Sequence, residues 1–363
     1  MNFVNQCYVT IRDGEKQMRP QYETGDISAI LSTIDSSSLC NRCFYITGAT
    51  GLIGQYLVKT LLTLSETRSD IRIIANVRDI DKARNCFKDY PDNIEYDICD
   101  IKDITLEDKG IDYILHCASN TSSKAFVEQP VSIIEDNVLG TMRIIELAKA
   151  NNIKKLIYLS TMEIYGNPID DTPVTEGAPS NLDILSSRSS YPESKRLCET
   201  LCASSGIPFC SVRLTQTIGP GIAYNDGRVF AEFSRCVVEH KDIVLKTKGL
   251  TKRDYIYLAD AITAIFTILI KGTSGEAYNV ANEESYCSIR EMAECVIETF
   301  APELKVIIDE TGCADRGFCP TMKMNLSSNK LRTLGWAPAY DLMRMYEILI
   351  SYLRDLADPS KSC

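Results

Sequence analysis

Apolar and polar residues alternate in blocks along most of the chain, and the blocks predict strands alternating with helices. Short, continuous apolar runs have the length and the β-branched or aromatic content of buried strands. These runs are Cys43–Thr47, Ile71–Val77, Ile94–Tyr96, Tyr113–His116, Leu156–Ser160 and Phe209–Leu214. Helical spacing of apolar positions lies between several of them, at Leu52–Leu64, Pro130–Ala150 and Glu193–Ala203. Because such alternation builds right-handed βαβ units, the pattern predicts an α/β fold with a doubly wound parallel sheet covered by helices on both faces.

The alternation becomes irregular after about Leu214, which indicates a second, smaller region. Helices are predicted there at Val229–Glu239, Leu258–Lys271, Ile289–Phe300 and Leu342–Leu356. Residues 1–40 are polar and weakly patterned, apart from a helix predicted around Ile27–Ile34, and we interpret them as an N-terminal extension.

Charge and hydropathy limit the partners of the chain. Its 39 Lys and Arg against 49 Asp and Glu give a formal net charge of −10, which does not suit binding to a nucleic-acid backbone. The apolar stretch Ala264–Ile270 is far too short to cross a bilayer, and the first residues lack the basic start and apolar run of a secretory signal. We therefore predict a cytoplasmic protein with neither a nucleic-acid nor a membrane partner.

The 15 cysteines raise the question of a metal site or a disulfide framework. They are scattered along the chain, with Cys40-x-x-Cys43 as the only CxxC pair and His116 and His240 as the only histidines. A structural zinc site needs four soft ligands close together. We therefore predict no metal and interpret the cysteines as reduced thiols packed as small apolar side chains, which is typical of a reducing compartment.

A glycine-rich turn follows the first predicted strand and opens the first predicted helix. In Gly48-Ala49-Thr50-Gly51-Leu52-Ile53-Gly54, the first glycine permits the tight turn, the second permits close approach to a pyrophosphate, and the third permits close helix–strand packing. The helix N-terminus supplies free N–H groups and a positive dipole end to the anion. This context predicts a dinucleotide-binding site of the Rossmann type.

The end of the second strand bears on which nicotinamide cofactor binds. An acidic residue there binds the ribose 2′-hydroxyl of NAD, whereas an arginine suits the 2′-phosphate of NADP. The segment reads Ala75-Asn76-Val77-Arg78-Asp79 and carries both signals. NAD is favoured, with NADP as the alternative.

Two later segments carry groups for redox chemistry. Thr161 and Glu163 follow a predicted strand directly, and Ser190–Lys195 opens a predicted helix. Tyr191 and Lys195 are four residues apart and therefore share one helical face. The phenol of a tyrosine titrates near ~10, and a neighbouring ammonium and a cationic nicotinamide lower that value. Such a tyrosine can take a proton from a sugar hydroxyl while hydride passes to the cofactor.

Together, these motifs resemble the extended short-chain dehydrogenase/reductase family, specifically its NAD-dependent nucleotide-sugar epimerases, dehydratases and decarboxylases. The resemblance covers about Phe44 to Leu356. It implies a Rossmann domain over residues 41–214, with a contribution from 251–285. A smaller C-terminal α/β region over 215–250 and 286–363 would then bind the nucleotide sugar.

The resemblance also implies roles for individual residues. The implied cofactor-binding residues are Gly48, Thr50, Gly51, Leu52, Ile53, Gly54, Asn76, Arg78, Asp97, Ile98, Cys117, Ala118, Ser119, Tyr191 and Lys195. The implied substrate-binding residues are Gln216, which stands where the family usually has Asn, Arg228 in a loop like that of UDP-glucuronate decarboxylases, and Arg253, where the family clamps the nucleotide diphosphate.

The family's chemistry begins by oxidising the sugar at C4, which implies Tyr191 as base, Lys195 as its partner and Thr161 as a hydrogen-bond donor to the new ketone. Family 4,6-dehydratases commonly carry an Asp–Glu pair where this chain has Met162 and Glu163. A thioether cannot donate a proton to a departing hydroxyl, which disfavours the usual dehydration. Decarboxylases share the pattern of Thr and Glu separated by one non-acidic residue. Decarboxylation of a nucleotide hexuronate is therefore favoured over C4 epimerisation, with Glu163 as a further catalytic residue.

Three alternative functions also fit parts of this pattern. An NADPH-dependent 4-keto nucleotide-sugar reductase would use Arg78, and a 4,6-dehydratase would need another acid. A non-catalytic dinucleotide sensor would need the glycine turn but not Thr161, Tyr191 and Lys195 together. The family usually dimerises through two helices, here those after Pro130 and around Tyr191, so a homodimer is predicted.

Overall fold

The computed structural model describes residues 19–68, 70–90, 92–311 and 321–358, and it divides into two compact units. The first unit contains the described residues within Met1–Thr161, Asp183–Arg213 and Ile262–Tyr278. The second contains those within Met162–Leu182, Leu214–Ala261 and Asn279–Cys363.

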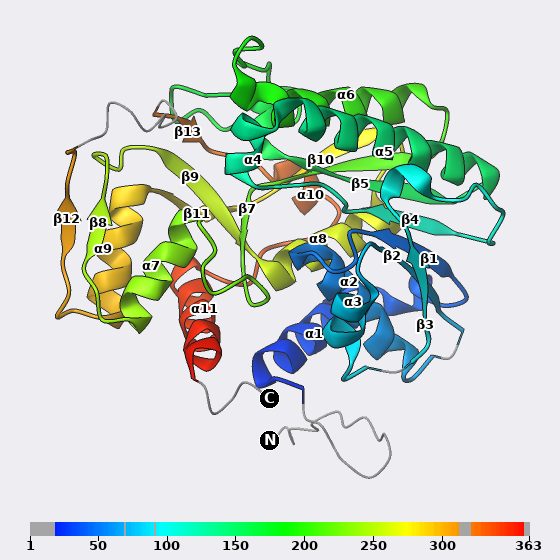
Figure 1. Ribbon diagram of the computed structural model, residues 1–363, viewed down its shortest axis with the longest axis horizontal. Coiled ribbons are helices and arrows are strands. Elements are labelled where there is room, and N and C mark those ends of the chain that lie inside the picture. Colours follow the sequence, from blue (N-terminus) through cyan, green and yellow to red (C-terminus); the bar gives the residue numbers. More distant parts are fainter. Residues whose placement is uncertain (1–18, 69, 91, 312–320, 359–363) are drawn as a thin grey trace. The chain divides into compact units, whose positions relative to one another are not determined.

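The first unit is built on a seven-stranded sheet in the order β10-β6-β5-β4-β1-β2-β3 (Figure 1). Its strands are β1 (Cys43–Thr47), β2 (Arg72–Val77), β3 (Ile94–Ile98), β4 (Tyr113–His116), β5 (Lys155–Thr161), β6 (Phe209–Leu214) and β10 (Glu276–Val280). Neighbours from β3 through β5 pair in parallel. The strand order reverses direction between β1 and β4, which is the switch point of a doubly wound sheet. The predicted α/β Rossmann fold is confirmed.

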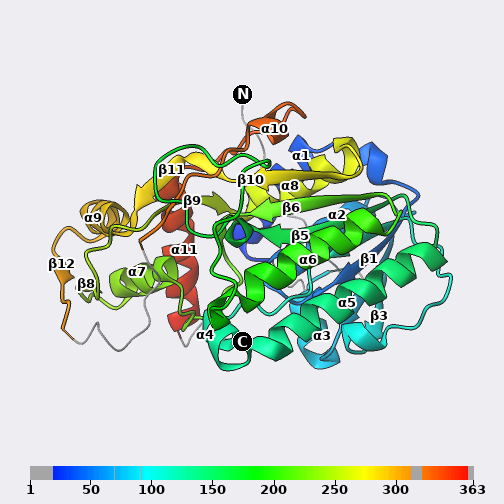
Figure 2. The same cartoon turned by 90° about the horizontal axis from the view of Figure 1, so that it is seen from above.

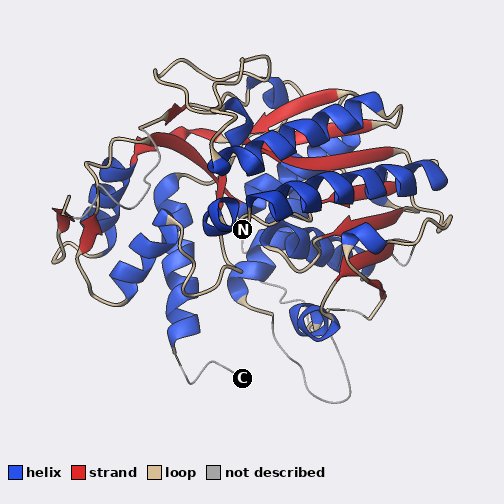
Figure 3. Cartoon of the chain, turned by 45° about the horizontal axis from the view of Figure 1, so that its top comes forward, coloured by secondary structure: helices blue, strands red, loops and turns tan. Residues whose placement is uncertain are grey.

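Helices cover this sheet, as the blue and red elements of Figure 3 show. They are α2 (Leu52–Ser65), α3 (Ile80–Phe87), α4 (Ser123–Glu128), α5 (Pro130–Ala150), α6 (Ser190–Ser204) and α8 (Leu258–Lys271). Helix α2 packs against β1 and β2, whereas α5 packs against β4 and α6 against β5. Helices α5 and α6 lie side by side along the sheet (Figure 2). All residues of β1 are buried because the strand is central and covered on both faces.

A helix of the predicted extension, α1 (Gln21–Thr33), packs against α2. It begins earlier than the predicted helix around Ile27–Ile34, and residues 1–18 of the extension lie outside the described residues. Its apolar side, with Ile27 and Ile30, is buried. The contact also buries charge, since Lys59 of α2 donates a 2.5 Å hydrogen bond to Glu23 and Tyr90 donates one of 2.7 Å to the same carboxylate.

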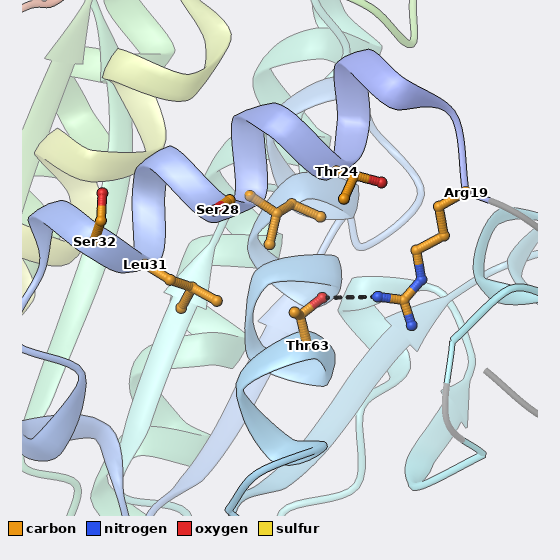
Figure 4. Close-up of a pocket in the computed structure, with 7 residues that line it drawn as sticks. Arg19, Thr24, Ser28, Leu31, Ser32 and Thr63 are labelled. Carbon is orange, nitrogen blue, oxygen red and sulfur yellow. Dashed lines mark hydrogen bonds between the residues drawn. The ribbon is translucent and has the colours of Figure 1, made fainter. Parts of the chain in front are cut away.

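A pocket of about 240 Å³ lies between α1 and α2 (Figure 4). Arg19 crosses one end of it, where its guanidinium donates to Thr63 and pairs with Glu66. The same guanidinium lies 4.0 Å from the centre of the Tyr90 ring. None of the residues that the sequence predicts for cofactor or substrate binding lines this pocket.

The second unit holds a four-stranded sheet and a two-stranded one. The larger sheet consists of β7 (Gln216–Ile218), β9 (Lys252–Tyr257), β11 (Asn282–Ser288) and β13 (Lys323–Met324), with β9 in the middle, and β8 (Ile243–Leu245) pairs with β12 (Val306–Ile308). Its helices are α7 (Val229–Val238), α9 (Ile289–Phe300), α10 (Asn329–Arg332) and α11 (Leu342–Ala357). Helices α7, α9 and α11 pack on one another through their apolar faces. No helix in the described part of the chain has the length and apolar character needed to cross a membrane.

Candidate active site

The glycine turn after β1 can exist only with glycine at its main positions. Gly48 has a φ of +61°, and a Cβ added there would lie 2.8 Å from the backbone nitrogen of Ala118. A Cβ at Gly54 would lie 2.2 Å from the carbonyl oxygen of Gly48. Helix α2 starts after Gly51, which offers no side-chain cap, so the N–H groups of its first turn have no side-chain acceptor. The turn therefore has the shape and the donors that a pyrophosphate requires.

Thr47 joins this turn to the loop after β4. Its Oγ1 accepts hydrogen bonds of 3.0 Å from the backbone N–H groups of both Cys117 and Ala118. The same oxygen lies 2.9 Å from Nδ1 of His116, and Nε2 of His116 lies 3.2 Å from Oγ1 of Thr141. Because both acceptor positions of Thr47 are filled, its hydroxyl hydrogen must point to Nδ1, which assigns the imidazole hydrogen to Nε2.

His116 is neutral in this arrangement. It is 3% exposed, and burial, together with the charge of Lys195, lowers its pKa to about 3. Burial also raises the pKa of the neighbouring Cys117 thiol to about 12, so both groups are uncharged near pH 7. The loop that the resemblance assigns to the cofactor is therefore held by neutral hydrogen bonds.

Predicted cofactor residues come from the carboxyl ends of adjacent parallel strands, which share one edge of the sheet. Asn76, near the end of β2, is buried and donates from Nδ2 to the carbonyl oxygen of Asp97 on β3 and to that of Cys99, just after β3. Arg78 is exposed, and Ile98 is 55% exposed. Asp97 accepts a 2.6 Å hydrogen bond from the hydroxyl of Tyr45.

Asp79, the acidic residue of the segment that bears on the choice of NAD or NADP, has a structural role. Asp79 caps helix α3, where its side chain accepts a hydrogen bond from the backbone N–H of Lys82. Asn76 and Arg78 are the polar side chains of the segment Ala75–Asp79 that do not cap α3. Their contacts with a cofactor remain predictions.

The first unit also positions three of the predicted catalytic residues. Thr161 ends β5 and is buried, and Tyr191 and Lys195 lie on the first turns of α6, 6% and 4% exposed. Lys195 donates from Nζ to the carbonyl oxygen of Leu159, at 2.8 Å, and its Nζ lies 5.9 Å from the centre of the Tyr191 ring. Burial lowers the pKa of Lys195 to about 8. The lysine still carries its charge at pH 7, close to the phenol.

Asn137 of α5 links the cofactor loop to α6. Its Oδ1 accepts a 2.8 Å hydrogen bond from Ser119, and its Nδ2 donates one of 2.9 Å to Ser194, which lies one residue before Lys195. Ser194 in turn donates to the carbonyl oxygen of Tyr191. The start of α6 and the loop after β4 are therefore held in one hydrogen-bonded arrangement.

The remaining predicted residues belong to the second unit. Glu163 is half-buried in the single helical turn Met162–Tyr165 that follows Thr161. Met162 is 3% exposed and packs in an apolar cluster with Val174, Met324 and Leu326. Its Sδ accepts a 3.3 Å contact from the hydroxyl of Thr215. The position that carries an acid in family dehydratases is thus an apolar core position here.

Arg253 on β9 has an unused donor. Its Nε is buried and has no hydrogen-bond partner among the described residues, which is uncommon for a buried donor. Asp254 follows it, and burial raises the pKa of that carboxyl to about 8. A neutral Asp254 at pH 7 leaves the positive charge of Arg253 uncompensated by its neighbour.

The other two predicted substrate residues differ in their surroundings. Arg228 forms a bidentate pair with Asp226 at the start of α7, with Nη2 2.7 Å from Oδ2, and lies over the ring of Phe230. Gln216 begins β7, the strand that pairs with β9, and is half-buried.

The contacts of the Tyr191 ring were not predicted from the sequence. The ring of Phe126, from α4, stacks on the Tyr191 ring with centroids 4.3 Å apart and planes 6° apart. The guanidinium of Arg188 lies 4.8 Å from the centre of the same Phe126 ring. The six-residue α4 has too few positions to show a periodic pattern, so the sequence carried no signal for this contact.

In the described part of the chain, no three His, Cys, Asp or Glu side chains lie close enough together to hold a metal ion. The glycine turn, the free N–H groups of α2 and the loop after β4 fit a dinucleotide instead.

Comparison with known proteins places this site in a family. Residues 44–281 match the NAD dependent epimerase/dehydratase family, and the chain belongs to it. It is thus an enzyme of a family that uses NAD, as predicted.

Three known proteins show which enzymes of the family the chain resembles. The chain is 26% identical over 308 residues to UDP-glucuronic acid decarboxylase 6 of Arabidopsis thaliana, covering 83% of this chain and 86% of that one. It is 27% identical over 311 residues to mouse dTDP-D-glucose 4,6-dehydratase, covering 81% and 83%. In fold it resembles a UDP-glucose 4-epimerase of Thermotoga maritima, with a TM-score of 0.72 and 19% identity, over 87% of this chain and all of that one. The predicted nucleotide-sugar class agrees with the names of all three.

Proposed function

We propose that this enzyme decarboxylates a nucleotide hexuronate, with UDP-glucuronate as the first substrate to test, through transient oxidation of the sugar at C4. The observation that carries the proposal is the buried Met162 beside Glu163. Its thioether, packed in an apolar cluster, cannot serve as the acid that 4,6-dehydration needs. The UDP-glucuronic acid decarboxylases among the relatives support the same choice.

The first step needs a base and a donor at C4. Tyr191 takes the proton of the C4 hydroxyl, Lys195 keeps the phenol in its charged form, and Thr161 donates a hydrogen bond to the oxygen that becomes the ketone. A bound NAD would supply the hydride chemistry at C4, both the oxidation and the final reduction.

The ketone then makes loss of the carboxylate favourable. The electron pair of the bond between C5 and the carboxylate moves into the C4 carbonyl, and carbon dioxide leaves. A proton must then return to C5, and Glu163 is the ionisable side chain that the segment after Thr161 offers for this transfer. Reduction of the C4 ketone, with return of the proton from Tyr191, completes a nucleotide pentose.

The second unit is proposed to bind the nucleotide. The buried, unpartnered Nε of Arg253 supports a role as donor to the diphosphate, where a planar guanidinium can bind two oxygens at once. Arg228 is already paired with Asp226, so binding of an anion would exchange one carboxylate partner for another negatively charged group. Gln216 is proposed to contact the sugar nucleotide from β7.

The decisive experiment incubates the protein with UDP-glucuronate and NAD and follows carbon dioxide and UDP-pentose. Tyr191→Phe is the matched control, because it removes only the hydroxyl. Carbon dioxide and pentose from the wild type but not from Tyr191→Phe support the proposal. Interconversion of UDP-glucose and UDP-galactose without decarboxylation would make the enzyme a 4-epimerase. Net consumption of NADPH with a 4-keto nucleotide sugar would make it a reductase, for which the exposed Arg78 is the candidate 2′-phosphate ligand.

We also propose that the enzyme is a homodimer formed through α5 and α6. Helix α5 exposes Val131, Ile134, Leu139 and Met142, from 40% to 65% each, and the neighbouring α6 exposes Leu197 at 47%. An exposed apolar face on two packed helices is typical of a symmetric interface. Sedimentation should give a dimer at micromolar concentration. The double variant Val131→Glu and Met142→Glu should be monomeric.

The proposed compartment is the cytoplasm. Its support is the set of free thiols that includes the buried Cys198 and Cys202, which suits a reducing environment. Localisation of a fluorescent fusion checks this.

A further inference from the structure

The ring of Tyr191 needs a fixed orientation for its phenol to act as a base. A tyrosine side chain turns about two torsions, and the position of its hydroxyl depends on both. The backbone of α6 anchors only the Cα. Lys195 lies nearby: its Nζ donates to the carbonyl oxygen of Leu159 and lies 5.9 Å from the centre of the Tyr191 ring. The packing of the ring against its buried neighbours contributes to that position.

Phe126 supplies that packing. Its ring lies parallel to that of Tyr191, 6° apart in plane and 4.3 Å apart in centre, and the two pack with Ile133 in one small buried cluster. Of the residues of α4, Phe126 alone is buried, at 1% exposure. The short helix thus contributes one side chain to the interior, and that side chain lies against the proposed base.

Two contacts hold Phe126 in turn to the segment that precedes Tyr191. The guanidinium of Arg188 lies 4.8 Å from the centre of the Phe126 ring, a cation–π distance. The hydroxyl of Ser190 donates a 3.0 Å hydrogen bond to the carbonyl oxygen of Phe126. The backbone and the ring of Phe126 are therefore both tied to the start of α6.

We propose that Phe126, braced by Arg188, is a positioning residue that fixes the direction of the Tyr191 phenol for proton transfer at C4. Proton transfer requires the hydroxyl to lie within hydrogen-bond reach and in line, and small errors of placement lower the rate sharply. The proposal rests on the role of Tyr191 in the proposed function.

Four variants test it by steady-state kinetics with UDP-glucuronate. Phe126→Leu keeps an apolar side chain but removes the ring, and should lower kcat at least tenfold while KM changes less than twofold. Phe126→Tyr keeps the ring and should restore most of the rate. Arg188→Gln should lower kcat two- to fivefold. Lys124→Gln, at a 79% exposed side chain of the same helix, should not change it.

A second measurement does not depend on turnover. A single fluorotyrosine placed at position 191 reports ring orientation by fluorine NMR of the full-length protein. The wild type should show one resonance, and Phe126→Leu should show two or an exchange-broadened one, with unchanged NAD content. If the wild type fails to decarboxylate, the proposed function fails but this spectrum still tests the stack. An unchanged spectrum in Phe126→Leu, or an unchanged kcat in an active enzyme, would overturn the proposal.

Discussion

Lys195 donates a 2.8 Å hydrogen bond from its Nζ to the carbonyl oxygen of Leu159, which lies two residues before Thr161 on the same strand. The bond crosses from α6 to β5 and fixes the lysine beside the strand end that carries the threonine. It provides a neutral hydrogen-bond acceptor for the charge of a residue that is 4% exposed, and the centre of the Tyr158 ring lies 4.9 Å from the same nitrogen. This placement, which the proposed reaction needs, therefore costs stability, because the ammonium has lost most of its water.

This cost predicts a pH-dependent stability for Lys195→Met. Burial lowers the pKa of Lys195 from 10.5 to about 8, so the unfolded chain binds more protons between these values and wild-type stability rises with pH in that window. At about 1.4 kcal/mol per pKa unit, the penalty near pH 7 is about 3 kcal/mol. Urea unfolding should show that Lys195→Met is favoured over wild type by about 3 kcal/mol more at pH 7 than above pH 10.

The exposed Lys82 provides the control for that measurement. Lys82→Met should differ from wild type by the same amount at every pH. A difference for Lys195→Met that stays constant with pH would contradict the assignment of a desolvated ammonium at this position.

Thr47→Val should weaken NAD binding, although Thr47 is not one of the predicted cofactor-binding residues. The substitution keeps the shape of the side chain but leaves the N–H groups of Cys117 and Ala118 without their acceptor. Each unsatisfied buried group costs about 1–3 kcal/mol, so the loop should relax away from the glycine turn. We expect about tenfold weaker NAD binding by calorimetry, and near wild-type binding in Thr47→Ser. Equal affinities in wild type and Thr47→Val would show that the loop does not depend on this hydroxyl.

Two glycine-to-alanine substitutions should have opposite effects. In Gly54→Ala the new Cβ would meet the backbone oxygen of Gly48 at 2.2 Å, which only a shift of the turn can relieve. NAD binding should be lost. In Gly25→Ala of α1 nothing lies within 4 Å of the new Cβ, and a helix-interior alanine should stabilise the fold by about 0.5–1 kcal/mol. Thermal unfolding and bound-NAD content distinguish the two; retention of NAD by Gly54→Ala would refute the close packing of the turn.

Glu23→Ala should be strongly destabilising although it lies far from the predicted site residues in sequence. It leaves the buried Lys59 without its carboxylate partner and removes the acceptor of the Tyr90 hydroxyl. Loss of one partner of a buried pair costs about 3–5 kcal/mol. Combining Glu23→Leu with Lys59→Met should recover much of this in urea unfolding, because no charge is then left unpaired. A loss below about 0.5 kcal/mol, the range of ordinary surface substitutions, would mean that the pair is effectively solvated.

The sequence predicts the elements of the sheet domain closely where periodicity is strong. The predicted Cys43–Thr47, Pro130–Ala150 and Leu258–Lys271 coincide with β1, α5 and α8. The glycine turn could be placed because its positions combine a strand, a helix and fixed spacing. By contrast, the first turns of α1 bury charged residues such as Glu23, which contribute nothing to an apolar pattern, so the full extent of the helix and its docking on α2 were not predicted.

Some residues of the candidate site could likewise be predicted from the sequence, and others could not. Tyr191 and Lys195 are found from sequence because four-residue spacing fixes them on one helical face. Phe126 is not, because its stacking depends on a short helix brought from more than sixty residues earlier in the chain. Likewise, the unsatisfied Nε of Arg253 depends on the packing of β9 and is visible only in three dimensions.

The packing of α1 on α2 bears on how the chain emerges from a ribosome. The helices and the strand between them span residues 21–65, so they can meet before the rest of the sheet has been synthesised. Contacts of such short sequence separation form early. The helix that carries the glycine turn would then be shielded on its outer side during translation, when its other partners do not yet exist.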